Sequence, residues 1–485
     1  MIFNSITYLV LLSIVVPLWW VLPRRARLWL VFATSLTFYG FWRVEFLPLL
    51  LGTTGLDYVV ALGIERSESP LRRKLLLSIS LVSNLGVLMF FKYLYFVCDN
   101  ASGLLKLFGV DYTIPLPDII LPLGISFYVF HTLSYVIDVY RRFIPAEHDF
   151  VLFIDYVLFF PQLVAGPILR AAEVIPKISR RAAFQLEYVS DGLRRILFGL
   201  FLKVCLADEI ASLVDSGFDQ SMTFFGAFDV WTLAFLFGFQ IYFDFAGYSH
   251  IAIGSAKLMG ISFPENFNYP YLASSPRDFW RRWHISLSSW IRDYLYLPLA
   301  GARVMDHSTG GLASAAQAEH TERRDFALFA SWAIMGLWHG AAWTFLVWGL
   351  WHATFVFLYR TTQPACRKLP DWARTVGGWV LTLLIAMLGW IPFRATSLPM
   401  TFEMWGKILN PRQYASLSLP SNSYVIASML LAAMVAVYFV ETNVVPRLQR
   451  NAPLAFIAAT PVYAFLFAAV FVYLRPMRQF IYFQF

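Results

Sequence analysis

Residues 454–474 read LAFIAATPVYAFLFAAVFVYL and contain no charged side chain. A second uncharged run, YVIASMLLAAMVAVYFV, occupies residues 424–440. An α-helix needs about 20 apolar residues to cross the hydrocarbon core of a bilayer. These two runs therefore predict helices that are surrounded by lipid rather than by water.

The same pattern continues along the chain. Further apolar runs lie near residues 5–22, 28–51, 75–97, 119–137, 150–169, 192–214, 230–262, 326–359 and 376–393. The length rule thus predicts an all-α, polytopic membrane protein with roughly eleven to thirteen transmembrane or re-entrant helices. Only 14% of the residues are charged, whereas a soluble domain carries about a quarter. Residues 5–22 have no basic region before them and no cleavage site after them, which favours a retained span.

The formal charge of +8 does not indicate nucleic-acid binding. Lys and Arg occur in short clusters that flank the apolar runs, as the positive-inside rule expects for membrane anchoring. Basic residues at both ends of the run at 150–169 favour a re-entrant or oblique segment there. The three cysteines are far apart, so neither a disulfide framework nor a metal site is predicted.

No internal repeat or flexible linker divides the chain, which predicts a single domain over residues 1–485. All eight histidines and most paired charges lie in its middle, so we expect the catalytic core at about 120–355. Within it, the polar, small-residue stretch at 302–325 is predicted to be an exposed loop.

The densest chemical signal is SPRDFWRRWHISLSSWIR at residues 275–292. If it forms one helix from Pro276, a single stripe carries Arg277, Arg281, His284, Ser288 and Arg292. Such a stripe, with Arg282 beside it, could hold the phosphates of an anionic donor. Two other interpretations stay open: an amphipathic helix at the membrane surface, or a structural helix whose arginines extend to water.

A second signal is MGLWHGAAW at residues 335–343, where His339 follows Trp338 and precedes Gly340. An ionisable side chain within an apolar run is a functional candidate, although a neutral histidine bound to a backbone carbonyl is the alternative. His352 would lie on another face of one continuous helix, and we interpret it as structural.

A third signal is QIYFDFAGYSH at residues 240–250. Gln240, Asp244 and Tyr248 share one helical face if Gly247 does not break the helix. Asp244 cannot stay charged in lipid without a partner, so we expect it to pair with one of the arginines or to orient a histidine. A purely structural ion pair is equally compatible with the pattern. Upstream, FFPQLVAGP at 159–167 predicts a broken helix that lines a cavity.

The chain lacks a phosphate-binding Gly-Lys-Ser/Thr loop, a Rossmann glycine pattern and a Gly-x-Ser-x-Gly elbow. Acyl or proton transfer by an imidazole remains. At these residues the sequence resembles the membrane-bound O-acyltransferase family, and within it the bacterial alginate O-acetyltransferase branch. The resembling segments are residues 121–142, 160–170, 240–254, 265–267, 279–297, 336–343 and 480–485.

That resemblance implies a helical ring around a thinned centre, with a catalytic tunnel that reaches His339. His284 matches the second histidine of the family. The implied donor is a cytoplasmic acyl thioester, commonly acetyl-coenzyme A, without a permanently bound cofactor. The implied acceptor lies across a bacterial inner membrane and is reached through an extracytoplasmic polysaccharide acetyltransferase partner. Membrane lipids would surround the protein.

Two departures from the branch stand out. His250 replaces an aspartate that usually follows Gly-Tyr-Ser, and the loop at 302–325 is longer. The resulting hypothesis has His339 accept the proton of an attacking hydroxyl, with Asp244 or His284 orienting the reacting groups. A covalent acyl-histidine relay stays open. Substrate contacts are expected from Arg277, Arg281, Arg282, Ser288, Gln240, Asp244, Tyr248 and Trp338. Rival hypotheses are a transporter or flippase of a lipid-linked or acyl substrate, and a non-catalytic scaffold of a polysaccharide export complex.

Overall fold

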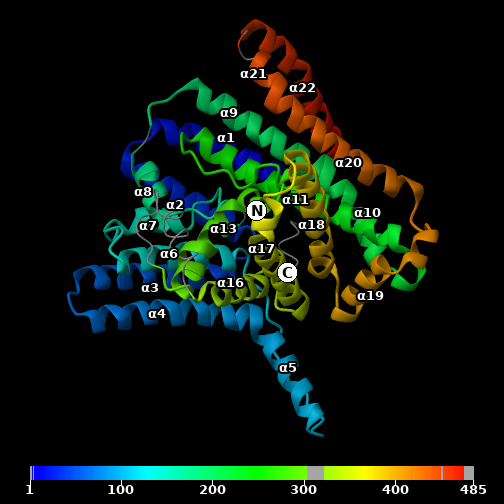
Figure 1. The fold of residues 1–485 in the computed structure, drawn as a ribbon. Coiled ribbons are helices and arrows are strands. Elements are labelled where there is room, and N and C mark those ends of the chain that lie inside the picture. The colour runs from blue at the N-terminus through cyan, green and yellow to red at the C-terminus, as the bar shows by residue number, and fades with distance from the viewer. Residues whose placement is uncertain are drawn as a thin grey trace. The chain divides into compact units, whose positions relative to one another are not determined.

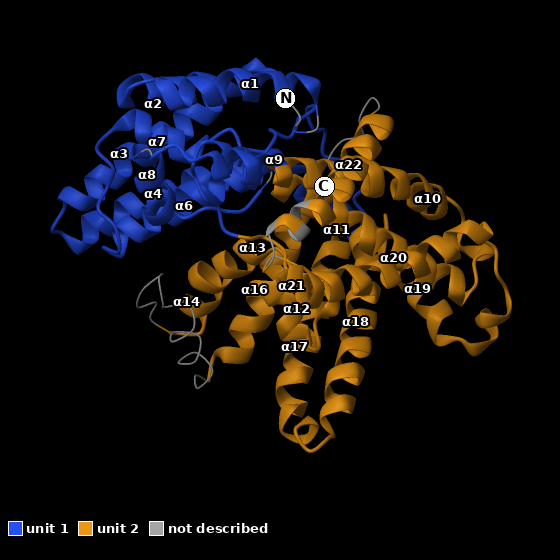
Figure 2. Ribbon diagram, turned by 90° about the horizontal axis from the view of Figure 1, so that it is seen from above, with its two compact units in different colours: residues 1–193, 252–264 blue, residues 194–251, 265–485 orange. Residues whose placement is uncertain are grey.

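The computed structural model describes residues 3, 5–164, 166–180, 182–302, 322–448, 450 and 452–474. This part of the chain is helical and holds no strand (Figure 1). The chain divides into two compact units, coloured in Figure 2, and each is described by itself. Unit 1 comprises residues 1–193 and 252–264, and unit 2 comprises residues 194–251 and 265–485. Two of the boundaries fall inside continuous helices, and the single domain stays a prediction.

Unit 1 contains α1 (Ile6–Val21), α2 (Arg24–Gly40), α3 (Leu47–Arg66), α4 (Pro70–Leu88), α5 (Leu94–Leu107), α6 (Ile125–Tyr140), α7 (Phe150–Val157) and α8 (Ala171–Ser179). Helices α9 (Leu186–Leu200) and α11 (Ala227–Leu258) contribute residues to both units. Unit 2 adds α10 (Asp208–Phe218), α12 (Pro276–Arg282), α13 (Ile285–Ile291), α14 (Leu297–Leu299), α16 (Arg324–His339), α17 (Trp343–Cys366), α18 (Gly378–Arg394), α19 (Leu398–Leu409), α20 (Ser421–Phe439), α21 (Val445–Leu448) and α22 (Ala452–Tyr473).

Several helices are long and apolar enough to cross a membrane. Among the described residues there are five, at Val44–Arg66, Pro70–Leu107, Ala227–Leu258, Ala373–Arg394 and Ser421–Leu448. Shorter apolar helices occupy Ile6–Val21 and Ile457–Tyr473. Large apolar side chains lie exposed on them, including Val82 on α4 and Phe471 on α22. These features confirm the all-α, multi-pass membrane fold, whereas the count of eleven to thirteen stays a prediction.

Irregular backbone explains why some apolar runs yield no long helix. Helix α7 ends at Val157, and the run at 150–169 continues as a buried non-helical segment. Its backbone is held in place by α6, since the Leu169 N–H donates to His131 Nε2 over 3.1 Å. Gly124 allows close contact, because a Cβ there would lie 2.5 Å from the Leu163 carbonyl oxygen. The predicted break in this segment is confirmed.

In unit 2, Asp229 connects the start of α11 to the segment before α20 through hydrogen bonds. Its buried carboxylate accepts hydrogen bonds from the backbone N–H groups of Gly226 (2.7 Å), Ser418 (3.0 Å) and Leu419 (3.2 Å). The Tyr424 hydroxyl donates to the same carboxylate. Four donors on one buried acid make this contact a strong tie between segments distant in sequence.

Two further segments singled out in the sequence are the expected loop at 302–325 and the end of the chain at 480–485. Residues 303–321 of the expected loop at 302–325 lie outside the described residues, as does the segment 480–485. Arg324 and Asp325 belong to the first turn of α16 and not to a loop.

Candidate active site

His339 is the last residue of α16, at the turn into α17. Glycines bring these two helices together. A Cβ on Gly336 would lie 2.3 Å from the Phe345 carbonyl oxygen, and a Cβ on Gly349 would lie 2.3 Å from the Trp332 carbonyl oxygen. Both positions therefore require glycine, and the closely packed α16–α17 pair fixes the backbone at His339.

The His339 imidazole is 4% exposed and lies in an aromatic box made of Trp338, Trp348 and Phe393. The ring centroids of Trp338 and Trp348 are each 4.9 Å from that of His339, and Phe393 is at 5.4 Å. All three meet the imidazole at steep angles, so their rings wall it off from bulk water. Trp338, expected near the substrate, is thus a direct neighbour of His339.

The expected single helix at 276–292 is wrong, because the chain breaks at Trp283 and His284. Helix α12 ends at Arg282, Trp283 is extended, and His284 is left-handed with φ 41° and ψ 56°. Helix α13 begins at Ile285. Left-handed backbone is uncommon for a non-glycine residue and is costly unless its surroundings enforce it.

Asn266 enforces the break. Its backbone carbonyl accepts from the Ile285 N–H over 2.9 Å, and its side-chain carbonyl accepts from the Ser286 hydroxyl over 2.8 Å. Its amide donates to Ser249 over 3.1 Å. Asn268 adds a backbone hydrogen bond of 2.9 Å to the Arg282 carbonyl. Donors and acceptors that a continuous helix would use internally are thereby satisfied by the segment at 266–268.

His284 itself is 1% exposed and packs on Phe245, with ring centroids 4.6 Å apart. Neither ring nitrogen has a hydrogen-bond partner within the described part of the chain. Burial lowers the pKa of His284 to about 3, so the imidazole is neutral at physiological pH. A neutral, buried ring in this position can orient neighbours but cannot serve as a cation for phosphates.

The predicted cationic stripe does not exist as one helical face. Arg277 and Arg281 belong to α12, and Ser288 lies beyond the break, where its hydroxyl donates to the Trp283 carbonyl. Arg282 is held by Asp278, with 3.0 Å between Nε and Oδ2. Arg281 is exposed. Arg292 pairs with Asp293 at 2.7 Å.

The structure does not bring the two predicted catalytic histidines into ring contact within the described residues. A series of aromatic rings in edge-to-face, tilted and stacked contacts connects them. From His284 toward His339 it comprises Phe267, Trp283, Trp390 and Trp348.

His352, which we interpreted as structural, belongs to this aromatic cluster, and the continuous helix expected from His339 to His352 is wrong. It lies between Phe279 and Trp332, whose planes are within 3° and 28° of its own. Its ring centroid is 5.2 Å from that of Trp348, which also contacts His339. The chain turns at Gly340–Ala342, so His339 and His352 are on successive helices.

The same cluster contains buried polar atoms that sequence reasoning missed. The indole N–H groups of Trp280, Trp348 and Trp390 have no acceptor among the described residues. His352 Nε2 also has no hydrogen-bond partner there. Buried donors of this kind are costly unless a ligand or water satisfies them. They make the surroundings of His339 suited to an oxygen-bearing substrate.

Asp244 has a different partner from the arginine or histidine that we expected. Helix α11 continues through Gly247, which places Gln240, Asp244 and Tyr248 on one face as predicted. Asp244 Oδ1 lies 2.6 Å from Lys203 Nζ, and Lys203 also reaches Asp208 at 2.8 Å. The lysine side chain is 2% exposed.

Glycines again explain the approach: a Cβ on Gly199 would lie 2.6 Å from the Gly247 carbonyl oxygen. Lys203 is the only charged residue between Arg195 and Asp208, a signal that could have identified it. Gln240 is buried, with no hydrogen-bond partner on Oε1 among the described residues, and Tyr248 lies beneath the Lys203 ammonium at 5.7 Å.

His250 makes a second polar contact on α11. Its Nδ1 accepts from Arg195 Nη1 over 3.2 Å, and Arg195 also forms an ion pair with Glu265. Arg195 therefore connects the His250 imidazole to the Glu265 carboxylate.

Comparison with known proteins identifies relatives over most of the chain. Residues 140–393 match the membrane-bound O-acyltransferase family. The chain is 37% identical to a probable alginate O-acetylase of Azotobacter vinelandii, over 90% of this chain and 85% of that protein. It is 38% identical to a probable alginate O-acetylase of Pseudomonas aeruginosa, over 84% of this chain and 74% of that protein. It is 37% identical to a peptidoglycan O-acetyltransferase of Helicobacter pylori, over 78% of this chain and 72% of that protein.

Proposed function

Because the chain belongs to the membrane-bound O-acyltransferase family, we propose that it moves an acetyl or other short acyl group from a cytoplasmic thioester to an extracytoplasmic polysaccharide. The enzyme class follows from the family, and the relatives named for alginate and peptidoglycan support a polysaccharide acceptor. The donor we propose is acetyl-coenzyme A, the acceptor a polymer such as alginate, and the location the inner membrane of a bacterium.

The observation that carries the mechanism is the buried imidazole of His339 at the α16–α17 turn. In the first step, His339 accepts the proton of the attacking hydroxyl as its oxygen bonds to the thioester carbonyl carbon. The C–S bond then breaks, and the thiolate takes the proton from the imidazolium as it leaves toward the cytoplasm. Acyl ester and free thiol are the products, so atoms and charge balance.

Negative charge develops on the carbonyl oxygen during this attack and needs a hydrogen-bond donor. The Trp348 indole supports this role, because it contacts His339 and its buried N–H has no acceptor among the described residues. A prearranged donor of this kind typically contributes about 10²–10³-fold to the rate.

Donor phosphates would be bound by Arg281, which is exposed, together with Arg277. Arg282 would have to leave Asp278 to take part. Asp244, which Lys203 neutralises, and His284 would position the surrounding helices. We propose that an extracytoplasmic acetyltransferase partner completes transfer to the polymer.

The experiment uses the purified protein in lipid nanodiscs with labelled acetyl-coenzyme A and a soluble acceptor oligosaccharide. His339→Ala should reduce thiol release and acyl transfer at least about 10²-fold while the protein remains folded. The matched control is His148→Ala, which removes an exposed imidazole that pairs with Glu65. Uptake of label without thioester cleavage would instead indicate a transporter. Normal turnover by His339→Ala would overturn the role of His339. A non-catalytic scaffold would release no thiol even as the wild-type protein, and replacing His339 and His284 would leave its cellular phenotype unchanged.

A further inference from the structure

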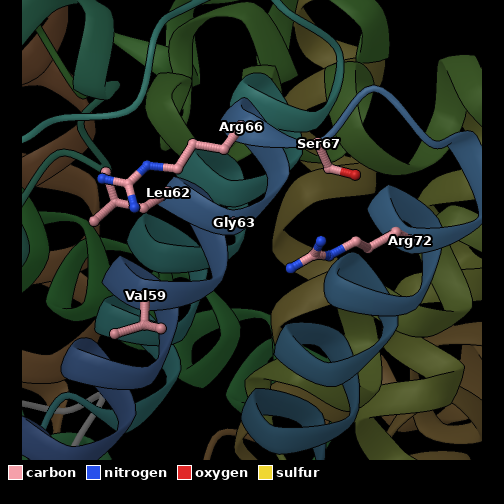
Figure 3. A pocket seen from close by; sticks show the side chains of 6 residues that line it. All are labelled: Val59, Leu62, Gly63, Arg66, Ser67 and Arg72. Carbon is pink, nitrogen blue, oxygen red and sulfur yellow. The ribbon is translucent and has the colours of Figure 1, made fainter.

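A pocket of about 250 Å³ lies where α3 ends and α4 begins (Figure 3). Val59, Leu62, Gly63, Arg66, Ser67 and Arg72 line it. The two helices pack against each other, and each is part of a candidate membrane span. The pocket is therefore at the end of two spans, where hydrocarbon gives way to headgroups.

Each of the two helices contributes one arginine to the lining of this pocket. Figure 3 shows the Arg72 guanidinium in the gap between the two helices, level with Gly63, and the Arg66 guanidinium beside Leu62. Neither forms an ion pair with an acidic group within the described residues. The nearby Glu65 is engaged elsewhere, since it pairs with His148 and accepts from the Ala146 N–H. Two guanidinium groups with unused donors suit a phosphate, which they bind through paired hydrogen bonds.

Apolar side chains of α3, Val59 and Leu62, also line the pocket. Val59 is 64% exposed, and Leu71 and Leu75 continue the exposed apolar surface along α4. A free phosphate gains nothing from such a wall, whereas an acyl chain buries apolar area against it. The combination of charge and apolar surface fits one molecule that carries both a phosphate and a hydrocarbon chain.

The position of the pocket indicates which lipids it meets. Four basic residues surround this short connection: Arg66, Arg72, Arg73 and Lys74. The positive-inside rule assigns such a connection to the cytoplasmic face, and acidic neighbours count little in that rule. Anionic lipids attract basic residues at this surface.

We propose that this pocket binds an anionic phospholipid of the cytoplasmic leaflet, with the phosphate on Arg72 and Arg66 and an acyl chain along Val59 and Leu71. Gly63 keeps the site open on the α3 side, since it presents no side chain to the gap. The site is in unit 1 and does not involve the residues around His339.

The test is native mass spectrometry of the delipidated full chain titrated with phosphatidylglycerol or phosphatidylcholine. Phosphatidylglycerol should bind more tightly, and Arg66→Gln/Arg72→Gln should weaken it by about ten- to hundredfold, as loss of charged hydrogen bonds predicts. Lys74→Gln is the matched control, because it removes a cation from the same helix end without lining the pocket. It should change phosphatidylglycerol binding by less than about twofold.

A second variant keeps the test decisive if the double substitution impairs folding. Val59→Trp fills the apolar side from an exposed position and should weaken both lipids. The proposal is overturned if wild-type protein binds the two lipids equally, or if Lys74→Gln matches the double variant. It is also overturned if inorganic phosphate displaces phosphatidylglycerol when the two are present at equal concentration. That result would identify a site for a simple anion.

Discussion

Replacing Lys203 with Met tests the buried ion cluster in which this lysine pairs with Asp208 of α10 and Asp244 of α11. The ammonium lies 2.6 Å from Asp244 and 2.8 Å from Asp208, and the side chains of Lys203 and Asp244 are 2% and 4% exposed. Lys203→Met leaves both carboxylates without their cation. Removal of one partner from a buried ion pair destabilises by about 3–5 kcal/mol, and we expect that range here.

The geometry predicts an order among variants. Asp244→Asn should cost less, about 1–3 kcal/mol, because Asp208 remains beside the ammonium. Lys203→Met/Asp244→Leu should recover part of the loss, since an apolar pair of similar volume often equals a buried ion pair, while the Asp208 carboxylate, whose side chain is 17% exposed, stays without Lys203. Lys177→Met, an exposed lysine that bonds the Ser262 carbonyl, is the control and should stay within about 0.5 kcal/mol.

The assay is thermal or denaturant unfolding of each purified variant in the same detergent, combined as a double-mutant cycle. The reasoning is refuted if Lys203→Met is as stable as the wild type, or if the double variant is no more stable than the single one. Acyl transfer by the double variant adds a second result. If stability recovers and activity does not, Asp244 contributes to the reaction beyond its structural role.

Three further predictions concern single residues. Trp348→Phe keeps an aromatic ring beside His339 but removes the indole N–H, so kcat should fall about 10²-fold with little change in KM; an unchanged kcat would exclude the indole as an oxyanion donor. Asp229→Ala removes the acceptor of the Gly226 and Ser418 backbone N–H groups, whereas the Leu419 N–H keeps the Tyr424 hydroxyl as an acceptor. The free energy of unfolding should fall by about 1–3 kcal/mol, and a thermal unfolding midpoint equal to that of the wild type would contradict this contact. Because burial lowers the pKa of His284 to about 3, its contribution to stability is complete above about pH 6.5 and is lost as pH falls toward 3. His284→Asn tolerates the left-handed backbone and should lose less stability over that acid range, and an identical pH profile would argue against a neutral buried imidazole.

The helical membrane fold could be predicted because it depends on local composition. Runs of uncharged residues such as 424–440 become helices wherever they lie, and α20 occupies this one. His339 could likewise be identified as a buried ionisable group between glycines, and the structure explains the glycines by the crossing of α16 and α17.

The break at His284 could not be predicted from its own segment. Neither Gly nor Pro stands at positions 283 and 284, and the helical periodicity of side chains continues through them. The free energy that favours the break comes from Asn266, whose hydrogen bonds replace those of a helix. A helical wheel cannot include a partner from another segment.

Partners of buried charges were harder to assign than the charges themselves. The apolar surroundings of Asp244 predict that it needs a cation. They do not distinguish the arginines near His284 from Lys203, a single lysine in another apolar run. Its contact depends on Gly199 and Gly247, which let two backbones touch. The turn at Gly340–Ala342, which places His352 on a separate helix from His339, likewise could not be predicted from side-chain periodicity.

The location of His339 at the carboxyl end of α16 has an electrostatic consequence for proton transfer. The last carbonyl groups of a helix together carry about half a negative charge, which stabilises a cation there by roughly 0.3–2 kcal/mol. In the mechanism that we propose, the imidazole is such a cation only while it holds the proton of the attacking hydroxyl. The backbone dipoles of α16 would then stabilise this charged intermediate relative to the resting enzyme and supply part of the driving force for deprotonation.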